Sequence, residues 1–398
     1  MKGAGRDVIV RRLVDDDVER YLELRDVSFG YPSGDDIRAE IAGRMATTWG
    51  AFRGDALAAS LADPRFEVYV AGVRVPMAGV AAVQTAPEHR RLGLAARLLR
   101  HALEIARDDG IGWSLLYPFD PRFYTRYGWQ GLSTGVTLEM PLERLAGGAL
   151  ADATRVTSDL RGAFQALYAR CAVGWTFANA RTIGPWDVWE DLLAEPGQQG
   201  LAYRLDDAYV VLQHHYEDDQ HGPVLRVRDH AHASASGRRA LLALLASFAG
   251  QSSKIVIDVP ATDPLAWDWS GWYAKHARKT LMARVADVPS AIARLRARTS
   301  TGERIDLDPC TVTIRDAFAP WNDGSWRVTP GPDRCVVARS DRAITTLDVR
   351  GLALLLSGAV TPRTVILAGL AEGDHAALDT LATLAAGRTP YQAPVDAF

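Results

Sequence analysis

Cysteine is scarce in this sequence, which excludes some ways of stabilising a fold. The 398 residues include three cysteines, at positions 171, 310 and 335. Three scattered thiols are too few for a disulfide framework, and neither they nor the nine histidines match a zinc-binding spacing. The sequence therefore predicts a protein with no disulfide framework and no bound metal.

Long apolar runs and a strong net charge are also missing. The stretch LALLLSGAV, at 352–360, is far shorter than the roughly 20 residues of a membrane span. The start of the chain lacks the apolar core of a secretory signal. A net charge of −3 differs from the strongly basic surface of a nucleic-acid-binding domain. We therefore expect a cytoplasmic protein with no membrane or nucleic-acid partner.

What is present is the composition of an ordinary globular protein, with 48% hydrophobic and 23% charged residues. At about 100–200 residues per domain, the length suggests two to four domains. The first part, 1–147, has a mixed α/β pattern. Strands are expected at 66–75, 77–83, 114–119 and 131–140. Helical segments are expected at 14–24, within 37–61 and after the 77–83 strand, where the helix ends at about 107.

The second part, 148–283, repeats this order of strands, helix and strand, which indicates a duplicated fold. Its expected elements are a helix at 159–173, strands within 201–215 and at 224–230, a helix at 237–249 and a strand at 254–260. The third part, 284–398, has short strands followed by helices at 349–357 and 374–386. That succession is an α+β pattern.

The stretch VQTAPEHRRLGLAARLLRHALEIARDDG, 83–110, joins a strand to an amphipathic helix. The start of a helix exposes unpaired backbone N–H groups and a partial positive charge, so a phosphate can bind there. Gly93 would let a ligand approach the backbone, and Arg90 and Arg91 would add permanent charge. The joint therefore predicts an anion-binding loop. A plain strand–turn–helix with surface arginines is the alternative.

Two motifs carry a resemblance to a known family. Arg90-Arg91-Leu92-Gly93-Leu94-Ala95 fits R/Q-x-x-G-x-G/A, the pyrophosphate loop of the GNAT N-acetyltransferases. V-x-x-A-P-x-H-R-R-x-G-L, beginning at Val83, together with Y-x-R-[FY]-G-[FYW], beginning at Tyr124, resembles the Eis (enhanced intracellular survival) acetyltransferases. The resemblance covers the whole length.

The family plan implies two tandem GNAT-like modules followed by a sterol-carrier-protein-like α+β domain. On this plan the catalytic module is 1–147 and the second module, which lacks the cofactor loop, is 148–283. The third domain is 284–398 and ends in the active site. The fold class expected for the chain is therefore α/β and α+β.

The resemblance also implies that acetyl-CoA is the co-substrate. In these enzymes the strand before the loop splays from its neighbour, and its free main-chain groups pair with the pantetheine arm. The residues expected to bind acetyl-CoA are Val83, Gln84, Thr85, Arg90, Arg91, Leu92, Gly93, Leu94, Ala95, Ala96, Phe119 and Asp120.

The catalytic groups are likewise implied by the resemblance. The family uses a tyrosine as the general acid and the terminal carboxylate as the general base, which here are Tyr124 and the α-carboxylate of Phe398. Tyr124 lies among other aromatic residues, so a packed core tyrosine is the alternative. The first module contains no cysteine, so we expect direct transfer in a ternary complex rather than a covalent acetyl-enzyme.

The acceptor expected for this N-acetyltransferase is a primary amine, either a small amine, an aminoglycoside-like compound or a lysine side chain. Family members that take polycations can carry an acid just before the C-terminus. Here Ala397 occupies that position and Asp396 precedes it, which weakens the case for an aminoglycoside. The family also implies a homo-oligomer, a hexamer. Two alternatives stay open: a non-catalytic acyl-CoA-sensing or lipid-binding protein that uses the sterol-carrier-like domain, and transfer of a longer acyl group.

Overall fold

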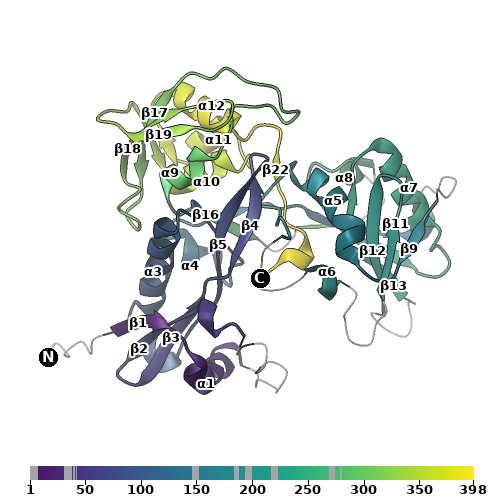
Figure 1. The fold of residues 1–398 in the computed structure, drawn as a ribbon, viewed down its shortest axis with the longest axis horizontal. Coiled ribbons are helices and arrows are strands. Elements are labelled where there is room, and N and C mark those ends of the chain that lie inside the picture. Colours follow the sequence, from purple (N-terminus) through teal and green to yellow (C-terminus); the bar gives the residue numbers. More distant parts are fainter. Residues whose placement is uncertain are drawn as a thin grey trace.

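The computed structural model describes residues 8–30, 38, 41, 43–145, 152–182, 188–192, 200–216, 223–268, 274–277 and 280–398. Its strands form sheets of eight, seven and five strands and one two-stranded sheet. The three larger sheets lie in three lobes around the C-terminal end of the chain (Figure 1). In the part of the chain described, no helix is long and apolar enough to cross a membrane.

The first sheet holds eight strands from two distant parts of the chain. Its strands, in pairing order, are β1 (Val8–Arg12), β2 (Thr48–Arg53), β3 (Ala56–Ala62), β5 (Val73–Thr85), β6 (Trp113–Leu116), β16 (Leu281–Val285) and β7 (Gln130–Leu132), with β4 (Arg65–Val70) paired to the first half of β5. Helices α1 (Val18–Phe29) and α3 (Leu94–Asp108) pack on this sheet in two separate apolar clusters. Since β5 and β6 are parallel, α3 is the crossover that connects them.

Two expectations for the first part are wrong. The segment 131–140 is two strands, because β7 ends at Leu132 and β8 (Val136–Pro141) begins the second sheet. Within the segment 37–61, which was expected to contain helical material, residues 48–61 instead belong to the antiparallel pair β2 and β3. Alanine favours a helix, but the five central residues of β3 are all buried, so sheet packing overrides that preference. Positions 37, 39, 40 and 42 of the same expectation lie outside the described residues.

The second sheet repeats the arrangement of the first. Its strands, in pairing order, are β15 (Ala274–Ala277), β8, β14 (Lys254–Val259), β13 (Pro223–His232), β12 (Ala208–Tyr216), β11 (Leu201–Arg204) and β9 (Thr154–Val156). Helix α7 (Ala235–Ala246) connects the parallel strands β13 and β14, as α3 connects β5 and β6. Helix α5 (Leu160–Ala172) packs on the sheet through a separate cluster. The expected duplication is therefore present.

The strands do not divide along the expected domain boundaries. Strand β8 falls within 1–147 but lies in the second sheet, and β16 spans the boundary at 283–284 but lies in the first. The chain thus forms most of the first sheet, then all of the second, and only then adds β16 to the first. Each sheet therefore depends on residues that the other part of the sequence supplies.

The third lobe is a five-stranded sheet with its helices packed against it. Its strands, in pairing order, are β19 (Val336–Arg339), β18 (Gly324–Thr329), β17 (Cys310–Arg315), β20 (Thr345–Asp348) and β21 (Ala371–Glu372). Its helices are α9 (Val288–Ala293), α10 (Val349–Leu356), α11 (Pro362–Leu367) and α12 (His375–Thr383). Seven of the eight residues of α10 are buried, so this helix is the core of the lobe. The expected α+β third part is confirmed.

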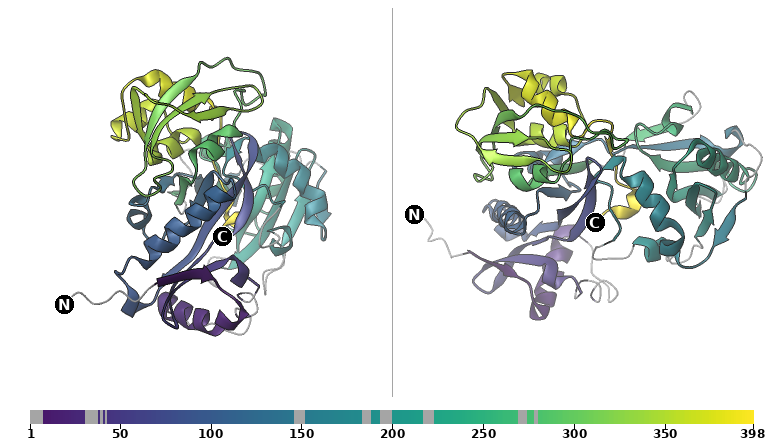
Figure 2. Two further views of the ribbon diagram at one scale, coloured as in Figure 1. Left: turned by 60° about the vertical axis from the view of Figure 1, so that its left-hand side comes forward. Right: turned by 45° about the horizontal axis from the view of Figure 1, so that its top comes forward.

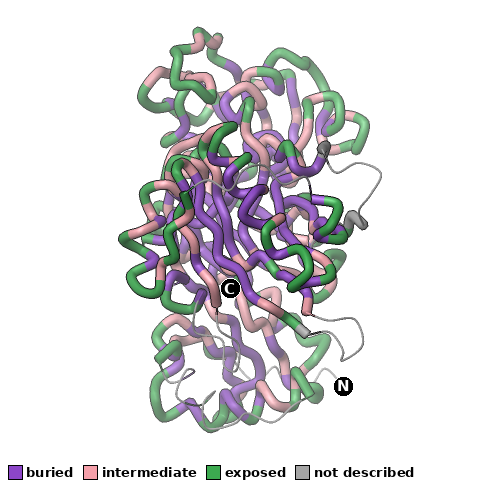
Figure 3. Tube along the Cα trace, turned by 90° about the vertical axis from the view of Figure 1, so that its right-hand side faces the viewer, coloured by how far each residue is buried: buried purple, intermediate pink, exposed green. Residues whose placement is uncertain are grey.

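The last ten residues leave the third lobe and run back between the other two. Strand β22 (Thr389–Pro390) pairs with β10 (Trp175–Thr176), which lies in the chain between β9 and β11 of the second sheet. The chain then ends where the three lobes meet (Figure 1, Figure 2). Buried positions are concentrated in the strands around this end (Figure 3).

A buried ion pair links the first sheet to the third lobe. Arg284 of β16 is fully buried, and its guanidinium donates to both oxygens of Asp316 at 3.0 and 2.9 Å. Burial lowers the pKa of Arg284, and the Asp316 carboxylate opposes that shift. The guanidinium also lies over the ring of Trp129 at 5.3 Å. A side chain at Gly128 would clash with it, which explains the glycine in the Tyr124–Trp129 motif.

We predict that Arg284→Met lowers the free energy of unfolding by about 3–5 kcal/mol, because the buried carboxylate of Asp316 would lose its cationic partner. Arg304 pairs with Asp306 at 3.0 Å, but both side chains are mostly exposed, so Arg304→Met should cost at most about 1 kcal/mol. Denaturant unfolding of the two variants checks this. Equal small losses would contradict a linking role for Arg284.

Candidate functional site

A cavity of about 850 Å³ lies at the start of α3. Its walls come from the end of β5, the loop to α3, the first turn of α3, the end of α1 and the aromatic segment after β6. The residues that line it are Ser28, Phe29, Val83, Gln84, Thr85, His89, Arg90, Arg91, Gly93, Leu94, Ala95, Ala96, Phe119, Phe123, Arg126 and Tyr127. The cavity is large enough for part of a cofactor-sized ligand.

The cavity exists because two neighbouring strands part. Strand β5 pairs with β6 from Met77 to Val80 and no further. Ala82, at the parting, has a φ of 45°, which is unusual for a residue with a side chain and bends the strand. Beyond it, Gln84 and Thr85 still pair with β3 on the other edge. The edge of β5 that faced β6 is therefore left open, as a peptide-like ligand requires.

The loop between β5 and α3 turns its backbone toward the cavity. Arg91 and Gly93 have left-handed φ values of 64° and 78°, and Gly93 is the N-cap of α3. The first intrahelical bond runs from the amide of Arg97 to the carbonyl of Gly93, at 3.0 Å. The amides of Leu94, Ala95 and Ala96 precede it, so they have no partner within the helix and point along its axis. Such a turn of amides is a binding site for an anion.

The charge of the cavity is positive. Arg90, Arg91 and Arg126 line it, and no carboxylate is found among the described residues of its wall. The guanidinium of Arg90 donates to the carbonyl of Thr85 at 3.4 Å, which holds it beside the open strand edge. Arg126 lies over the rings of Phe123 and Tyr127 at 5.1 and 5.8 Å. These arginines favour a phosphorylated ligand.

Most of the residues expected to bind a cofactor are brought together here. Ten of the twelve line the cavity; Leu92 and Asp120 do not. Leu92 points to solvent, with 52% of its surface exposed. The carboxylate of Asp120 accepts from the amide of Arg122 at 2.9 Å and caps the short helix α4 (Pro121–Thr125), so it serves the helix rather than the cavity.

Sequence reasoning missed several residues of the wall. Phe123, Arg126 and Tyr127 lie within or beside the Tyr124–Trp129 motif, so the motif itself was a signal for them. Ser28 and Phe29 come from the end of α1, and only the folded chain places them there. Phe119 stands in the wall with 72% of its surface exposed, so its ring is accessible from the cavity.

Tyr124 lies behind this wall at the parting of the strands. It belongs to α4 and is 3% exposed, with Phe119, Phe123 and Trp129 as ring neighbours at 5.6, 5.0 and 6.5 Å. It shares an apolar cluster with Val80 and Leu116, the last paired residues of β5 and β6. Burial raises the pKa of the phenol well above its ordinary value of 10, so it stays protonated at any physiological pH.

Phe398 approaches the same place from the other side. Its ring lies 4.6 Å from that of Phe66 and 5.9 Å from that of Tyr117, which follows β6. A side chain at Gly79 would come within 2.9 Å of the Phe398 ring, so the ring rests on β5 itself. The end of the chain and Tyr124 therefore both lie where β5 and β6 separate.

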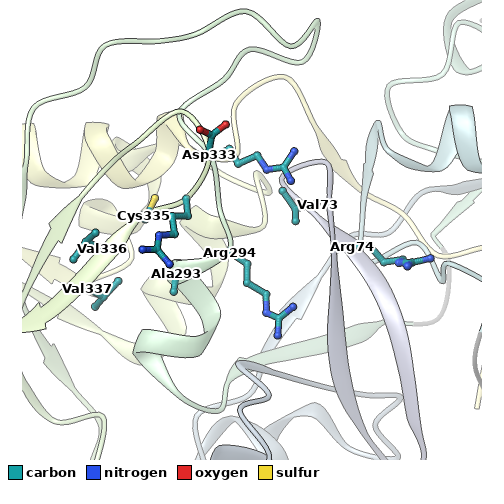
Figure 4. Close-up of a pocket in the computed structure, with 10 residues that line it drawn as sticks. Val73, Arg74, Ala293, Arg294, Asp333, Cys335, Val336 and Val337 are labelled. Carbon is teal, nitrogen blue, oxygen red and sulfur yellow. The ribbon is translucent and has the colours of Figure 1, made fainter.

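A second cavity, of about 640 Å³, lies between the β4–β5 hairpin and the third lobe (Figure 4). Arg74, Arg294, Arg296 and Arg334 line it. Arg74 is paired with Glu67 at 3.3 Å, and the side chains of Arg74 and Arg294 point in different directions (Figure 4). Since Arg74 and Arg294 do not converge on one point, they do not form an anion site together.

Comparisons with known proteins agree with the geometry. Residues 9–131 match the acetyltransferase (GNAT) domain, and residues 288–393 match the sterol carrier protein domain. An uncharacterised N-acetyltransferase of Streptomyces coelicolor is 27% identical over 313 residues, which are 73% of each chain.

Two solved structures share the fold along nearly the whole chain. A GCN5-related N-acetyltransferase from Anabaena variabilis superposes with a TM-score of 0.86 at 22% identity, over 98% of this chain and all of that one. Eis1 from Mycobacterium abscessus superposes with a TM-score of 0.77 at 21% identity, with the same coverage. At this identity the two structures show the fold alone.

The matched domains and the curated relative define the class of protein. It is an enzyme, an N-acetyltransferase built on a GNAT domain and carrying a sterol carrier protein domain at its C-terminal end. A GNAT domain implies the use of acetyl-CoA.

We predict that Gly93→Ala weakens coenzyme A binding by roughly tenfold or more, because a side chain would stand where the ligand approaches the loop. Gly110, at the other end of α3, provides a matched control. Both glycines are left-handed, and a methyl group added at either one would meet open space, but Gly110 lies outside the cavity.

Gly110→Ala should thus carry the same backbone strain and leave binding unchanged. Calorimetric titration of both variants with coenzyme A separates the two effects. Equal weakening in both would mean that strain, and not ligand contact, explains the loss.

Proposed function

We propose that this protein transfers an acetyl group from acetyl-CoA to a primary amine, directly and within a ternary complex. The observation that carries the proposal is the parting of β5 and β6 next to an amide-rich, arginine-lined loop. The buried phenol of Tyr124 and the end of the chain flank that parting. An acyl carrier and two proton-transfer groups could therefore meet at one point.

The cofactor roles follow from the chemistry of each part of the wall. The amides at the start of α3, with Arg90 and Arg91, suit the diphosphate. The open edge of β5 at Val83, Gln84 and Thr85 suits the amides of the pantetheine arm. The side chain of Gln84 donates to Ser60 at 2.8 Å in the interior, so its contribution to the cavity is its backbone.

The two proton-transfer groups have complementary roles. Acetyl-CoA supplies a thioester whose carbonyl carbon the amine attacks. The α-carboxylate of Phe398 takes the proton that the nitrogen releases as the C–N bond forms. A terminal carboxylate has an ordinary pKa of about 3.5, so it accepts the proton only once bonding has made the nitrogen acidic. Tyr124 gives its proton to the sulfur as the C–S bond breaks, and the two groups then exchange protons with solvent.

The structure favours a small amine or a lysine side chain over an aminoglycoside-like acceptor. A polycation needs carboxylates around the acceptor site. Asp396, the acid nearest to the end of the chain, is fully buried and paired with Arg181 at 2.9 Å, so it cannot face such a ligand. Ala397 offers no charge.

Several finer features belong to the same proposal. The protein is of the Eis type, works in the cytoplasm and assembles as a homohexamer. Its units are a catalytic module at 1–147, a second module at 148–283 and a sterol-carrier-like domain at 284–398, with β8 and β16 exchanged between the first two sheets. Both motifs of the Eis resemblance lie in the wall of the cavity or beside it, which supports this assignment.

Turnover of acetyl-CoA with a panel of primary amines tests the proposed function. The panel should include small monoamines, a lysine peptide and an aminoglycoside, and calorimetry should establish acetyl-CoA binding first. Acetylation of one class identifies the acceptor. Tight binding of acetyl-CoA with no turnover of any amine would favour a sensor instead.

We predict that Tyr124→Phe lowers kcat by roughly 10²-fold or more and leaves the Kd for acetyl-CoA nearly unchanged, because only the general acid is lost. Tyr69 is a matched control, since it is also buried, burial also raises its pKa, and it lies outside the cavity. Tyr69→Phe should keep full activity. Loss of acetyl-CoA binding in Tyr124→Phe would show that Tyr124 is a packing residue.

We also predict that two glycines added after Phe398 lower kcat by roughly 10²-fold without changing Tm. The added residues move the carboxylate away from the parting of β5 and β6 while the Phe398 ring can keep its contacts with Phe66 and Tyr117. The same two glycines added before Met1 are the control. Full activity of the C-terminal extension would remove the carboxylate from the mechanism.

A further inference from the structure

A buried ionic cluster stands two residues before the end of the chain. Arg181 is fully buried, and its guanidinium donates to both oxygens of Asp396 at 2.9 and 3.2 Å. The same guanidinium donates to both oxygens of Asp229 at 2.6 and 3.1 Å. All three side chains have at most 2% of their surface exposed. One arginine therefore fixes two carboxylates in its plane.

The cluster joins three separate segments. Asp229 belongs to β13 of the second sheet, Asp396 to the C-terminal tail, and Arg181 to the segment that follows β10. Tyr209 donates to Asp229 at 2.7 Å, and the hydroxyl of Tyr168 lies 3.4 Å from Asp396. Burial alone would lower the pKa of Arg181, but the two carboxylates raise it well above its ordinary value. The arginine is thus a permanent cation in this site.

The segment that carries Arg181 is itself fixed to the first sheet. The amide of Phe177 donates to the carbonyl of Tyr69 at 2.7 Å, and the amide of Ala180 donates to that of Glu67 at 2.8 Å, both in β4. Phe177 and Arg181 have left-handed φ values of 71° and 55°. Such strained residues persist only where the surroundings hold them, and they concentrate at functional sites.

Stability alone does not account for a cluster of this kind. Taking three charged groups out of water is costly, and well-packed apolar residues can tie a tail at least as firmly. The planar guanidinium has a property that apolar packing lacks. Its paired hydrogen bonds fix both the position and the orientation of the two carboxylates that it binds. This favours a role in placing the tail accurately.

The distance to the reacting end is short. From Asp396 to Phe398 the chain spans at most about 7 Å, at 3.3–3.6 Å per residue. A 3-10 turn, Pro394–Asp396, holds this stretch, with the amide of Asp396 donating to Ala393 at 3.0 Å. Beyond it, the Phe398 ring rests on Gly79 and Phe66. The terminal carboxylate therefore lies between two anchors, the ionic cluster on one side and the ring contact on the other.

We infer that Arg181 is a positioning residue of the transfer reaction, which holds Asp396 so that the α-carboxylate of Phe398 meets the acceptor amine. The inference rests on the proposed function, in which that carboxylate is the general base. Arg181 touches neither reactant in this role. It acts through the C-terminal tail. The segment that carries Arg181 is hydrogen-bonded to β4, which belongs to the same sheet as the separating strands β5 and β6.

The experiment measures tail docking and catalysis separately in the full-length protein. Arg181→Met and Asp396→Asn are each made alone and in combination with deletion of Phe398. Asp396→Asn keeps the shape of the side chain and the Arg181–Asp229 pair, so it should fold even if Arg181→Met does not. Release of Phe398 by carboxypeptidase reports docking, while kcat and the KM for acetyl-CoA report catalysis with an accepted amine.

We expect either substitution to speed the release of Phe398 and to lower kcat by roughly tenfold or more, with the KM for acetyl-CoA unchanged. Deleting Phe398 in addition should lower kcat no further than deleting it alone, because both changes remove the same placed carboxylate. Tyr209→Phe is the control. It loses a hydrogen bond to Asp229 but does not touch the tail, so it should lower Tm and change neither readout.

Each other outcome overturns the inference. Unchanged release of Phe398 would show that Arg181 does not hold the tail, whatever the reaction is. Faster release with unchanged kcat would show that placing the tail does not matter for catalysis. If Arg181→Met lowered kcat further in the protein that already lacks Phe398, the two losses would be independent. Arg181 would then have a general structural role. The C-terminal extension, tested separately, decides whether the carboxylate acts at all, so failure of the proposed function is distinguishable from failure of this inference.

Discussion

The separation of β5 from β6 after Val80 is the constraint on which the rest of the site depends. Paired strands satisfy each other's backbone groups, so an open edge inside a protein needs another partner. Here β5 keeps β3 on one side and leaves the other side free beside the first turn of α3. One distortion, at Ala82, thus creates both a slot for an extended ligand and access to the amides of a helix start.

The other two lobes serve this opening in different ways. The second sheet repeats the β–α–β crossover, but Ser234 caps α7 where the first sheet has the left-handed loop around Gly93. Its contribution is structural: with the segment after β10 it forms a wall on which the C-terminal tail docks. The third lobe supports the other side, since Arg284 and Asp316 connect it to Trp129, a ring neighbour of Tyr124. The ring neighbours of Tyr124 and of Phe398 belong to the first lobe, and the other two lobes support them from outside.

Local features of the sequence predicted a large part of this. The helix α3, the turn at Gly93 and the arginines on the loop follow from patterns within some twenty residues, so they could be identified before folding. The duplicated crossover was also evident from the order of strands and helices. Where the sequence misled was in β2 and β3, whose alanines favour a helix in isolation but are small enough to be buried in a sheet.

The sequence by itself determined the crossover units, the loop chemistry and the motif around Tyr124, because these depend on contacts between near neighbours. Only the tertiary structure decided that β16 joins the first sheet and that α1 adds Phe29 to the cavity wall. The same holds for the pairing of Arg181 with Asp396, 215 residues further along the chain. No periodicity connects such positions. They are brought together by the burial of apolar surface across three sheets, and a buried charge finds its partner only once that burial has fixed where each segment lies.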